Sequence, residues 1–349
     1  MATYRIAHYP GDGIGVDVTD EAVRVLEHVQ QQTSRLSLDF DRFDWGCDYY
    51  DKHGVVAPDD MLDTLGGFDA IFLGAIGYPS RLPDHVTLAP LIRIRQAFDL
   101  YACVRPAKLL PGVKSLLVDP GRIDMVVVRE NSEGEYVSMG GPFKVDKPDE
   151  IAIQTAIHTR RGIERVLRFS FELAQTRRNK LTMITKSNAQ RFGYVLWDRI
   201  LEEVCGDYSG VETDKLHIDA ASMEFVRRPS RFDVVVASNL FGDILTDLSG
   251  AITGSLGLNP SANLDPTRKR PSLFEPVHGS APDIAGKGIA NPVGAIQSAA
   301  MMLDWLGEQE AAVAVTAAVE AALAAGYATP DLGGALTTTD MTDRIIECM

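Results

Sequence analysis

Residues 233–250 read DVVVASNLFGDILTDLSG, an apolar run that passes directly into a segment with helical spacing. A short, nearly all-apolar run is typical of a strand buried on both faces, as the strands of parallel sheets are. Such runs, and the helical patterns that lie between them, are found at 4–9, 18–31, 69–74, 124–130 and 159–178. The alternation predicts an α/β fold with a mostly parallel sheet. In the helix expected at 159–178, the arginines lie off the apolar face and are expected to be solvated.

Composition limits the function classes. At 349 residues the chain exceeds the usual size of a single core, so we expect two domains. A formal net charge of -14 without a dense basic block argues against nucleic-acid binding. The widely spaced cysteines 47, 103, 205 and 348 indicate free thiols in a reducing compartment. Without a signal pattern or an apolar run of about 18 residues, we expect a cytoplasmic protein that does not contact membranes.

Two acids in the opening stretch indicate a metal site. Asp243 and Asp247 would lie on one face of a helix, where like charges are destabilising unless a cation lies between them. Carboxylate oxygens suit Mg²⁺ or Mn²⁺. Asp219, which follows a short apolar run in KLHIDAASM, is the candidate third ligand. The alternative is that these are ordinary solvated acids.

Three arginines indicate a substrate with several carboxylates. Arg95 lies in a helical segment, Arg105 follows it in VRPAK, and Arg129 closes the run DMVVVRE. Planar guanidinium groups bind carboxylates well, although each arginine alone is as readily structural. Lys186 in MITKSN and Tyr136 in SEGEYVS are candidates for proton transfer, because a lysine near other cations loses its proton more easily.

The stretch 274–292, FEPVHGSAPDIAGKGIANP, has neither a helical nor a strand period, which predicts a long loop that binds a ligand. A plain connector is the alternative. Its carboxylate Asp283 would repel a phosphate and suit the hydroxyls of an unphosphorylated ribose, so we expect NAD and not NADP. GDGIGV at 11–16 ends on Val16 and departs from the dinucleotide fingerprint, so it predicts a turn at the edge of the site.

Several spaced blocks together resemble the decarboxylating 2-hydroxy-acid dehydrogenases, the family of isocitrate and 3-isopropylmalate dehydrogenases. The blocks are GDGIG, the RP of VRPAK, VVVRENSEGEY, TKSN, SNLFGDILTDL and EPVHGSAPDIAGKGIANP, and they span essentially the whole chain in the family's order. The resemblance implies a two-domain α/β fold with a mostly parallel sheet, an arm and a non-classical nucleotide site. Residues 1–103 and 251–349 would form the cofactor-binding domain, and 104–250 the substrate and dimerisation domain, with an arm near 136–153.

The resemblance also implies roles for the candidate residues. Arg95, Arg105 and Arg129 would hold the substrate carboxylates, and Asp219, Asp243 and Asp247 would hold Mg²⁺ or Mn²⁺. Lys186 and Asp219 would act in the partner's active site, so a homodimer would be required. A base relay through Lys186 would take the hydroxyl proton, hydride would pass to NAD, and Tyr136 would protonate the carbon that has lost CO₂.

The same resemblance places NAD on the 274–292 loop. Asp283 would bind the adenosine ribose, and His278 and Asn291 would lie near the adenine. The full set of expected cofactor contacts is Glu275, His278, Gly279, Ser280, Ala281, Asp283 and Asn291.

The substrate is expected to be a small 2-hydroxy dicarboxylate. RENSEGEYVSMGG, GAIGYPSRLPDHVTL and PSANLDPTRKRPSLFEP resemble the subgroup that acts on tartrate and D-malate. Leu91 and Ile92 would instead suit an alkyl group on C3, so 3-isopropylmalate remains the alternative. Cys103 stands where the family usually has Asn, which would remove a polar contact near the nicotinamide or the substrate.

Two other function classes remain open. A regulatory subunit that binds without turnover would be expected to lack metal or acid–base residues, all of which are present here. A metal-dependent lyase or phosphatase would use the acids but would leave the 274–292 loop unexplained.

Overall fold

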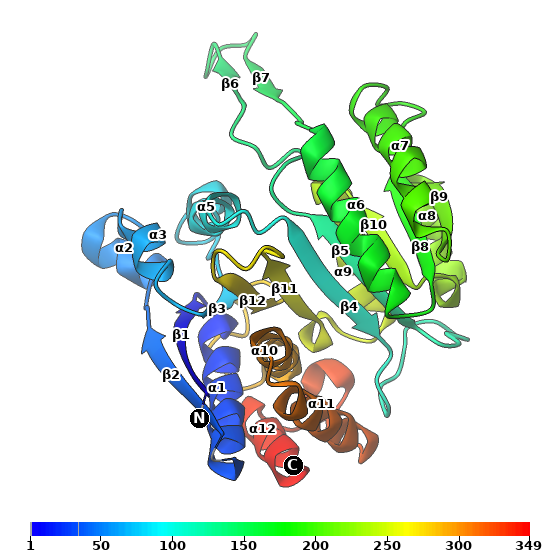
Figure 1. Ribbon diagram of the computed structural model, residues 1–349. Coiled ribbons are helices and arrows are strands. Elements are labelled where there is room, and N and C mark those ends of the chain that lie inside the picture. Colours follow the sequence, from blue (N-terminus) through cyan, green and yellow to red (C-terminus); the bar gives the residue numbers. More distant parts are fainter. Residues whose placement is uncertain (1, 34) are drawn as a thin grey trace.

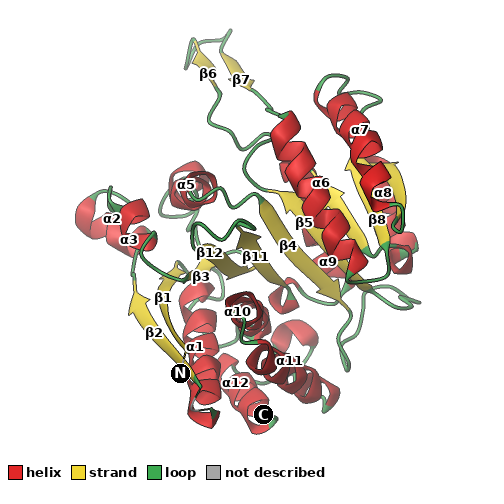
Figure 2. Ribbon diagram, viewed as in Figure 1, coloured by secondary structure: helices red, strands yellow, loops and turns green. Residues whose placement is uncertain are grey.

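A ten-stranded sheet runs through the molecule in the order β2-β1-β3-β12-β11-β4-β5-β10-β8-β9 (Figures 1 and 2). The computed structural model describes residues 2–33 and 35–349. The strands are β1 (Ala2–Gly11), β2 (Leu36–Arg42), β3 (Ala70–Ala75), β4 (Ala102–Lys108), β5 (Asp124–Glu130), β8 (Lys180–Thr185), β9 (Glu212–His217), β10 (Val234–Ala237), β11 (Pro260–Leu264) and β12 (Ser272–Pro276). Among the described strand pairs of this ten-stranded sheet, only β12–β11, β11–β4 and β4–β5 are antiparallel, so the predicted α/β fold with a mostly parallel sheet is confirmed.

Helices cover both faces of this sheet. They are α1 (Ile14–Gln32), α2 (Cys47–His53), α3 (Met61–Leu65), α4 (Asp84–Thr87), α5 (Ala89–Ala97), α6 (Arg160–Gln175), α7 (Gly193–Val204), α8 (Ile218–Arg227), α9 (Asn239–Ile252), α10 (Val293–Leu306), α11 (Gln309–Ala324) and α12 (Thr338–Glu347). Helices α1 and α10 pack on β3 and β12, whereas α6 and α9 both pack on β5. Among the residues that the structure describes, no helix is long and apolar enough to cross a membrane.

Helix α6 shows how the sequence pattern produces the packing. Its side chains Ile163 and Phe171 recur on one face and are buried against β5 and β10. The expectation that its arginines are solvated was wrong at two positions. Arg165 donates to Asp99 at 2.6 Å, and Arg177, just after the helix, donates to Asp233 at 2.8 Å. Loops at the ends of neighbouring strands bring these acids to the helix, which local periodicity does not reveal.

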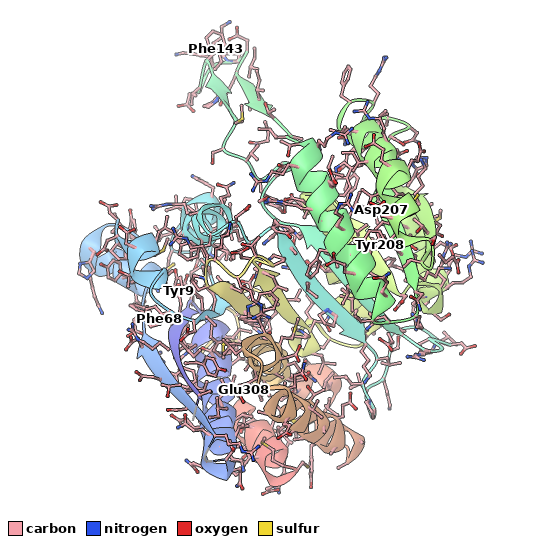
Figure 3. All side chains as sticks on the ribbon, viewed as in Figure 1. Tyr9, Phe68, Phe143, Asp207, Tyr208 and Glu308 are labelled. Atoms are coloured by element: carbon pink, nitrogen blue, oxygen red, sulfur yellow. The ribbon has the colours of Figure 1, made fainter. Side chains whose placement is uncertain are left out.

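An arm projects from the body of the molecule, as Figure 1 shows. It is a two-stranded antiparallel hairpin of β6 (Gly140–Phe143) and β7 (Ile151–Gln154). The hairpin overlaps the segment 136–153 in which an arm was expected and extends one residue beyond it. Phe143 lies at its tip with 62% of its surface exposed, and Ile153 is equally open (Figure 3). Large apolar side chains on a free hairpin are typical of a surface that meets another chain.

The antiparallel centre of the sheet joins its two halves. The domain boundary predicted between residues 103 and 104 falls inside β4, which pairs with β11 on one side and β5 on the other. The sheet is therefore continuous between the two predicted domains, and the chain passes from one half to the other through these central strands.

Candidate active site

The GDGIGV turn lies against the glycine-rich loop. Gly11 and Gly13 have positive φ angles of 73° and 58°, and the turn links β1 to α1 as predicted. Ile14 donates its backbone N–H to the carbonyl oxygen of Ser280 at 2.8 Å, and a Cβ on Gly13 would lie 2.1 Å from that oxygen. A side chain at position 13 would separate the two segments.

Most of the 274–292 stretch is a loop, as predicted. The prediction was wrong for residues 274–276, which belong to β12 because they continue its backbone pairing with β11. Beyond Pro276 the chain has no regular strand or helix until α10 begins at Val293.

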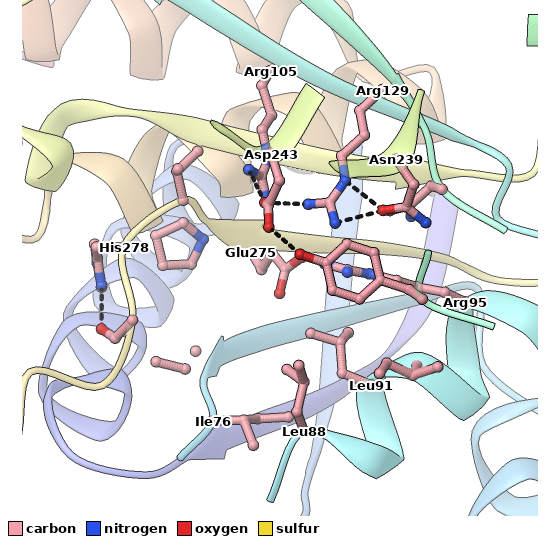
Figure 4. Close-up of a pocket in the computed structure, with 18 of the residues that line it drawn as sticks. Ile76, Leu88, Leu91, Arg95, Arg105, Arg129, Asn239, Asp243, Glu275 and His278 are labelled. Atoms are coloured by element: carbon pink, nitrogen blue, oxygen red, sulfur yellow. Dashed lines mark hydrogen bonds and ion pairs between the residues drawn. The ribbon is translucent and has the colours of Figure 1, made fainter. Parts of the chain in front are cut away.

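A cavity of about 170 Å³ lies between α5, the central strands and α9 (Figure 4). This volume is small for an organic ligand and suits a short acid. Its lining includes Ile76, Leu88, Leu91, Ile92, Arg95, Arg105, Asn131, Arg129, Tyr136, Asn239, Asp243, Glu275, His278 and Gly279. Figure 4 shows Ile76, Leu88 and Leu91 on one wall and Arg105, Arg129 and Asp243 on the opposite wall, with Arg95 entering from the same helix as Leu91. The three predicted arginines, Tyr136 and Asp243 are thus brought together.

Arg129 is held rigidly at the end of β5. Its side chain is 2% exposed, and Nε and Nη2 donate to Oδ1 of Asn239 at 2.9 and 2.6 Å. Nη1 donates to Asp243. Gly242 makes this approach possible, because a Cβ there would lie 2.6 Å from Cβ of Arg129. Asn239, at the start of α9, was not predicted, although its position directly after β10 is a strand end, where ligands of α/β proteins commonly bind.

Asp243 is the electrostatic centre of the cavity. Arg105 donates to it from Nη1 at 3.2 Å, and Tyr136 donates its hydroxyl to Oδ2 at 2.8 Å. Burial alone would raise the pKa of Asp243, but Arg129 and Arg105 outweigh burial and hold that pKa below its usual range. Burial, followed by the charge of Asp243, raises the pKa of Tyr136. The carboxylate is therefore ionised and the phenol protonated near neutral pH.

Arg95 has a carboxylate partner that the sequence did not reveal. It donates to Oε1 of Glu275 at 2.8 Å, and Asn263 donates to the same oxygen at 2.8 Å. Glu275, an expected cofactor contact, is only 5% exposed. Glu275 lines the cavity, and its Oε1 already accepts hydrogen bonds from Arg95 of α5 and Asn263 of β11.

The three predicted metal ligands are not all brought together. Asp243 and Asp247 share α9, and burial, followed by the charge of Asp243, raises the pKa of Asp247. A divalent cation would relieve this repulsion, so the pair fits one side of a metal site.

Asp219 is 66% exposed on α8 and accepts a hydrogen bond from Lys186 at 3.0 Å. Lys186 thus lies beside a carboxylate in the single chain. Over residues 2–33 and 35–349, no group of three or more His, Cys, Asp or Glu side chains is placed to hold a metal.

The expected cofactor residues occupy different environments. His278 and Gly279 line the cavity, whereas Asp283 is exposed on the loop. Asn291 is buried and donates its amide to Asp331 at 3.0 Å. Asp331 was not predicted, because it comes from the turn that precedes α12.

Cys103 does not line the cavity. It is fully buried, with its sulfur 3.5 Å from the hydroxyl of Ser261, which also accepts from Nε of Arg105 at 3.3 Å. Arg105 lines the cavity, and Cys103 does not. The position of Cys103 therefore does not support the expectation that it changes a contact of the substrate or nicotinamide.

Comparisons with known proteins agree with this arrangement. The model of the isocitrate/isopropylmalate dehydrogenase family matches residues 5–345. A probable tartrate dehydrogenase/decarboxylase of Bacillus subtilis is 49% identical over 99% of this chain and 98% of its own. A decarboxylating D-malate dehydrogenase of Escherichia coli is also 49% identical, over 99% of this chain and 98% of its own. A crystal structure of isocitrate dehydrogenase from Methylococcus capsulatus superposes with a TM-score of 0.89 at 37% identity, covering 99% of each chain. The chain therefore belongs to the isocitrate/isopropylmalate dehydrogenase family.

Proposed function

We propose that the protein is an NAD-dependent, metal-assisted dehydrogenase that oxidises and decarboxylates D-malate or tartrate. The observation that carries this proposal is the single cavity in which Arg95, Arg105 and Arg129 surround Asp243 and Tyr136. The names of the relatives that are 49% identical over nearly the whole chain support the choice of substrate.

The residues of the chain would divide the reaction between them. The arginines hold the substrate carboxylates and orient the hydroxyl-bearing carbon. Lys186 of the partner subunit takes the hydroxyl proton, and Tyr136, protonated near neutral pH, donates a proton to the carbon that loses CO₂. Mg²⁺ or Mn²⁺, held by Asp243, Asp247 and the partner's Asp219, would polarise the substrate oxygens, and NAD would accept the hydride.

A homodimer would complete this site. Asp219 lies on α8, which also exposes Met223, and Asp243 lies on α9, which exposes Ile244. Phe192, at the start of α7, is 84% exposed. These apolar side chains and the arm support a second copy covering this side of the molecule and bringing its Asp219 and Lys186 to Asp243. We further propose that residues 1–103 and 251–349 bind NAD and that 104–250 provide the dimer contacts.

The substrate can be tested with a panel of D-malate, the tartrate isomers, isocitrate and 3-isopropylmalate. We expect kcat/KM, measured by NADH formation with Mn²⁺, to be highest for D-malate or a tartrate. The apolar wall of Leu88, Leu91 and Ile92 favours 3-isopropylmalate as the second candidate. A higher kcat/KM for 3-isopropylmalate would favour that candidate. Substrate binding without NADH formation would indicate a regulatory subunit, and product release without NAD a lyase or phosphatase.

The cofactor can be tested at Asp283. Because this carboxylate is exposed and would repel a 2′-phosphate, we expect the wild type to prefer NAD strongly. Asp283→Lys combined with Ile284→Tyr should move the ratio of kcat/KM values toward NADP, since repulsion is replaced by attraction. Asp283→Asn is the matched control and should give an intermediate ratio. Equal use of both cofactors by the wild type, or an unchanged ratio in the double variant, would show that Asp283 does not contact the ribose.

A further inference from the structure

A second and larger cavity, of about 540 Å³, lies between α6 and the pair α10–α11. We call it the α6–α10 cavity. Its floor is formed by Val104 of β4, Ala262 of β11 and Phe274 of β12, and its walls include Phe169, Leu173, Ala300, Met301, Trp305, Ala312, Val313 and Ala317. Strands β4 and β11 are seen between these helices in Figure 1. The volume is within the range of small-molecule sites.

The rim of the α6–α10 cavity carries acids. The polar residues that line it are Gln297, Asp304, Thr316 and Glu320, so both charged side chains are negative. Glu320 accepts a hydrogen bond from Lys108 at 2.6 Å. Asp304 is exposed and has no side-chain hydrogen bond or ion pair to any residue that the structure describes. Arg268 lies over the ring of Trp305 and donates to its backbone carbonyl at 2.7 Å.

We propose that the α6–α10 cavity binds an amphipathic amine, with its apolar body on the floor and its ammonium group at Asp304. The apolar lining rewards burial of a hydrocarbon or aromatic body. A carboxylate would be repelled by Asp304 and Glu320, whereas an ammonium group would be attracted to Asp304, which forms no ion pair with any described residue. Because Arg268 already covers Trp305, the ammonium group is assigned to Asp304 and not to that ring.

The position of this cavity couples it to the candidate active site. Successive side chains of a strand point to opposite faces of a sheet. Val104, which lines the α6–α10 cavity, precedes Arg105, and Phe274 precedes Glu275, the partner of Arg95. An occupant that shifts β4 or β12 therefore moves the groups that hold the substrate. We infer that amine binding changes the affinity for the dicarboxylate, and that the dicarboxylate changes amine affinity by the same factor.

Calorimetric titration of the full chain with phenylbutylamine, phenylbutanol and phenylbutyrate tests the site without NAD or turnover. We expect the amine to bind most tightly and the carboxylate least. Asp304→Asn should reduce the affinity for the amine to that for the alcohol. Binding that is unaffected by Asp304→Asn, tighter binding of the carboxylate, or no binding of the amine at millimolar concentration would overturn the proposal.

Two matched variants of α11 locate the binding. Ala317 lines the cavity from its exposed edge, so Ala317→Trp should fill the cavity and abolish amine binding. Ala314 is exposed on the same helix without lining the cavity, so Ala314→Trp should leave amine binding unchanged. Equal amine binding by both variants would contradict the assignment, whether or not the proposed dehydrogenase activity is found.

The coupling has its own test, which rests on the proposed binding of D-malate. Repeating the amine titration at saturating D-malate should change the amine affinity several-fold, within the usual range of allosteric coupling. An unchanged affinity would overturn the coupling. If D-malate prevents amine binding completely, and does so in Ala317→Trp as well, the amine binds in the active site and the α6–α10 assignment is overturned.

Discussion

Replacing Asp243 with Asn is expected to lower kcat by about three orders of magnitude or more, because a metal contributes several kcal/mol to transition-state stabilisation and would lose its central carboxylate. The side chain keeps its shape, and its Oδ1 can still accept from Arg105 and Arg129. Its Nδ2 cannot accept from Tyr136 as Oδ2 does, so we expect a folded variant with a lower Tm. The measurements are kcat at saturating Mn²⁺, Mn²⁺ affinity by calorimetry, and Tm. Asp63→Asn, at an exposed acid on α3, is the control and should behave as the wild type.

The stability difference between the wild type and this variant should also depend on pH. The folded-state pKa of Asp243 is lowered by Arg129 and Arg105, so its charge stabilises the fold above the unfolded pKa. That contribution is lost as the pH falls through the folded value, so the Tm difference between wild type and Asp243→Asn should shrink below about pH 4. Full activity of the variant, or of the wild type in EDTA, would contradict the metal role.

Mixing inactive Lys186→Ala chains with inactive Asp243→Asn chains is expected to restore activity. If Lys186 serves the partner's site, each hybrid dimer has one site with both defects and one with neither. Random exchange then gives about a quarter of the wild-type specific activity. The structure motivates this test, because Lys186 pairs with Asp219 at 3.0 Å and neither joins Asp243 in the cavity of one chain.

The matched control pairs Lys186→Ala chains with Asp219→Asn chains. These two residues come from the same subunit of each site, so every site in a hybrid would carry one defect and no activity should return. Recovery in this control would show that Lys186 and Asp219 of one site come from different subunits. No recovery in the first mixture after verified subunit exchange would argue that each site is built from one chain.

Much of the fold was predictable because local patterns determine it. The buried face of α6, the strand that ends at Arg129 and the turn at Gly13 each follow from a few neighbouring residues. The proximity of Arg129 to Asp243 was also predictable, because the parallel neighbours β5 and β10 end at the same edge of the sheet.

The remaining features depend on contacts between distant parts of the chain. Arg95 and Glu275 are 180 residues apart and meet only because α5 lies next to β12. Nothing in either segment encodes that pairing. The ion pair of Arg165 with Asp99 has the same origin, since the acid comes from a loop that periodicity does not describe.

The pairing of β12 with β3 has a consequence for synthesis on the ribosome. Ser272 pairs with Ala70, and all six residues of β3 are buried in the finished sheet. At about 5–20 residues per second, the roughly 200 intervening residues take on the order of 10–40 seconds to translate. During that time the nascent chain carries an apolar strand edge without its neighbour. The newly made N-terminal segment is therefore a natural substrate for a chaperone until β12 emerges.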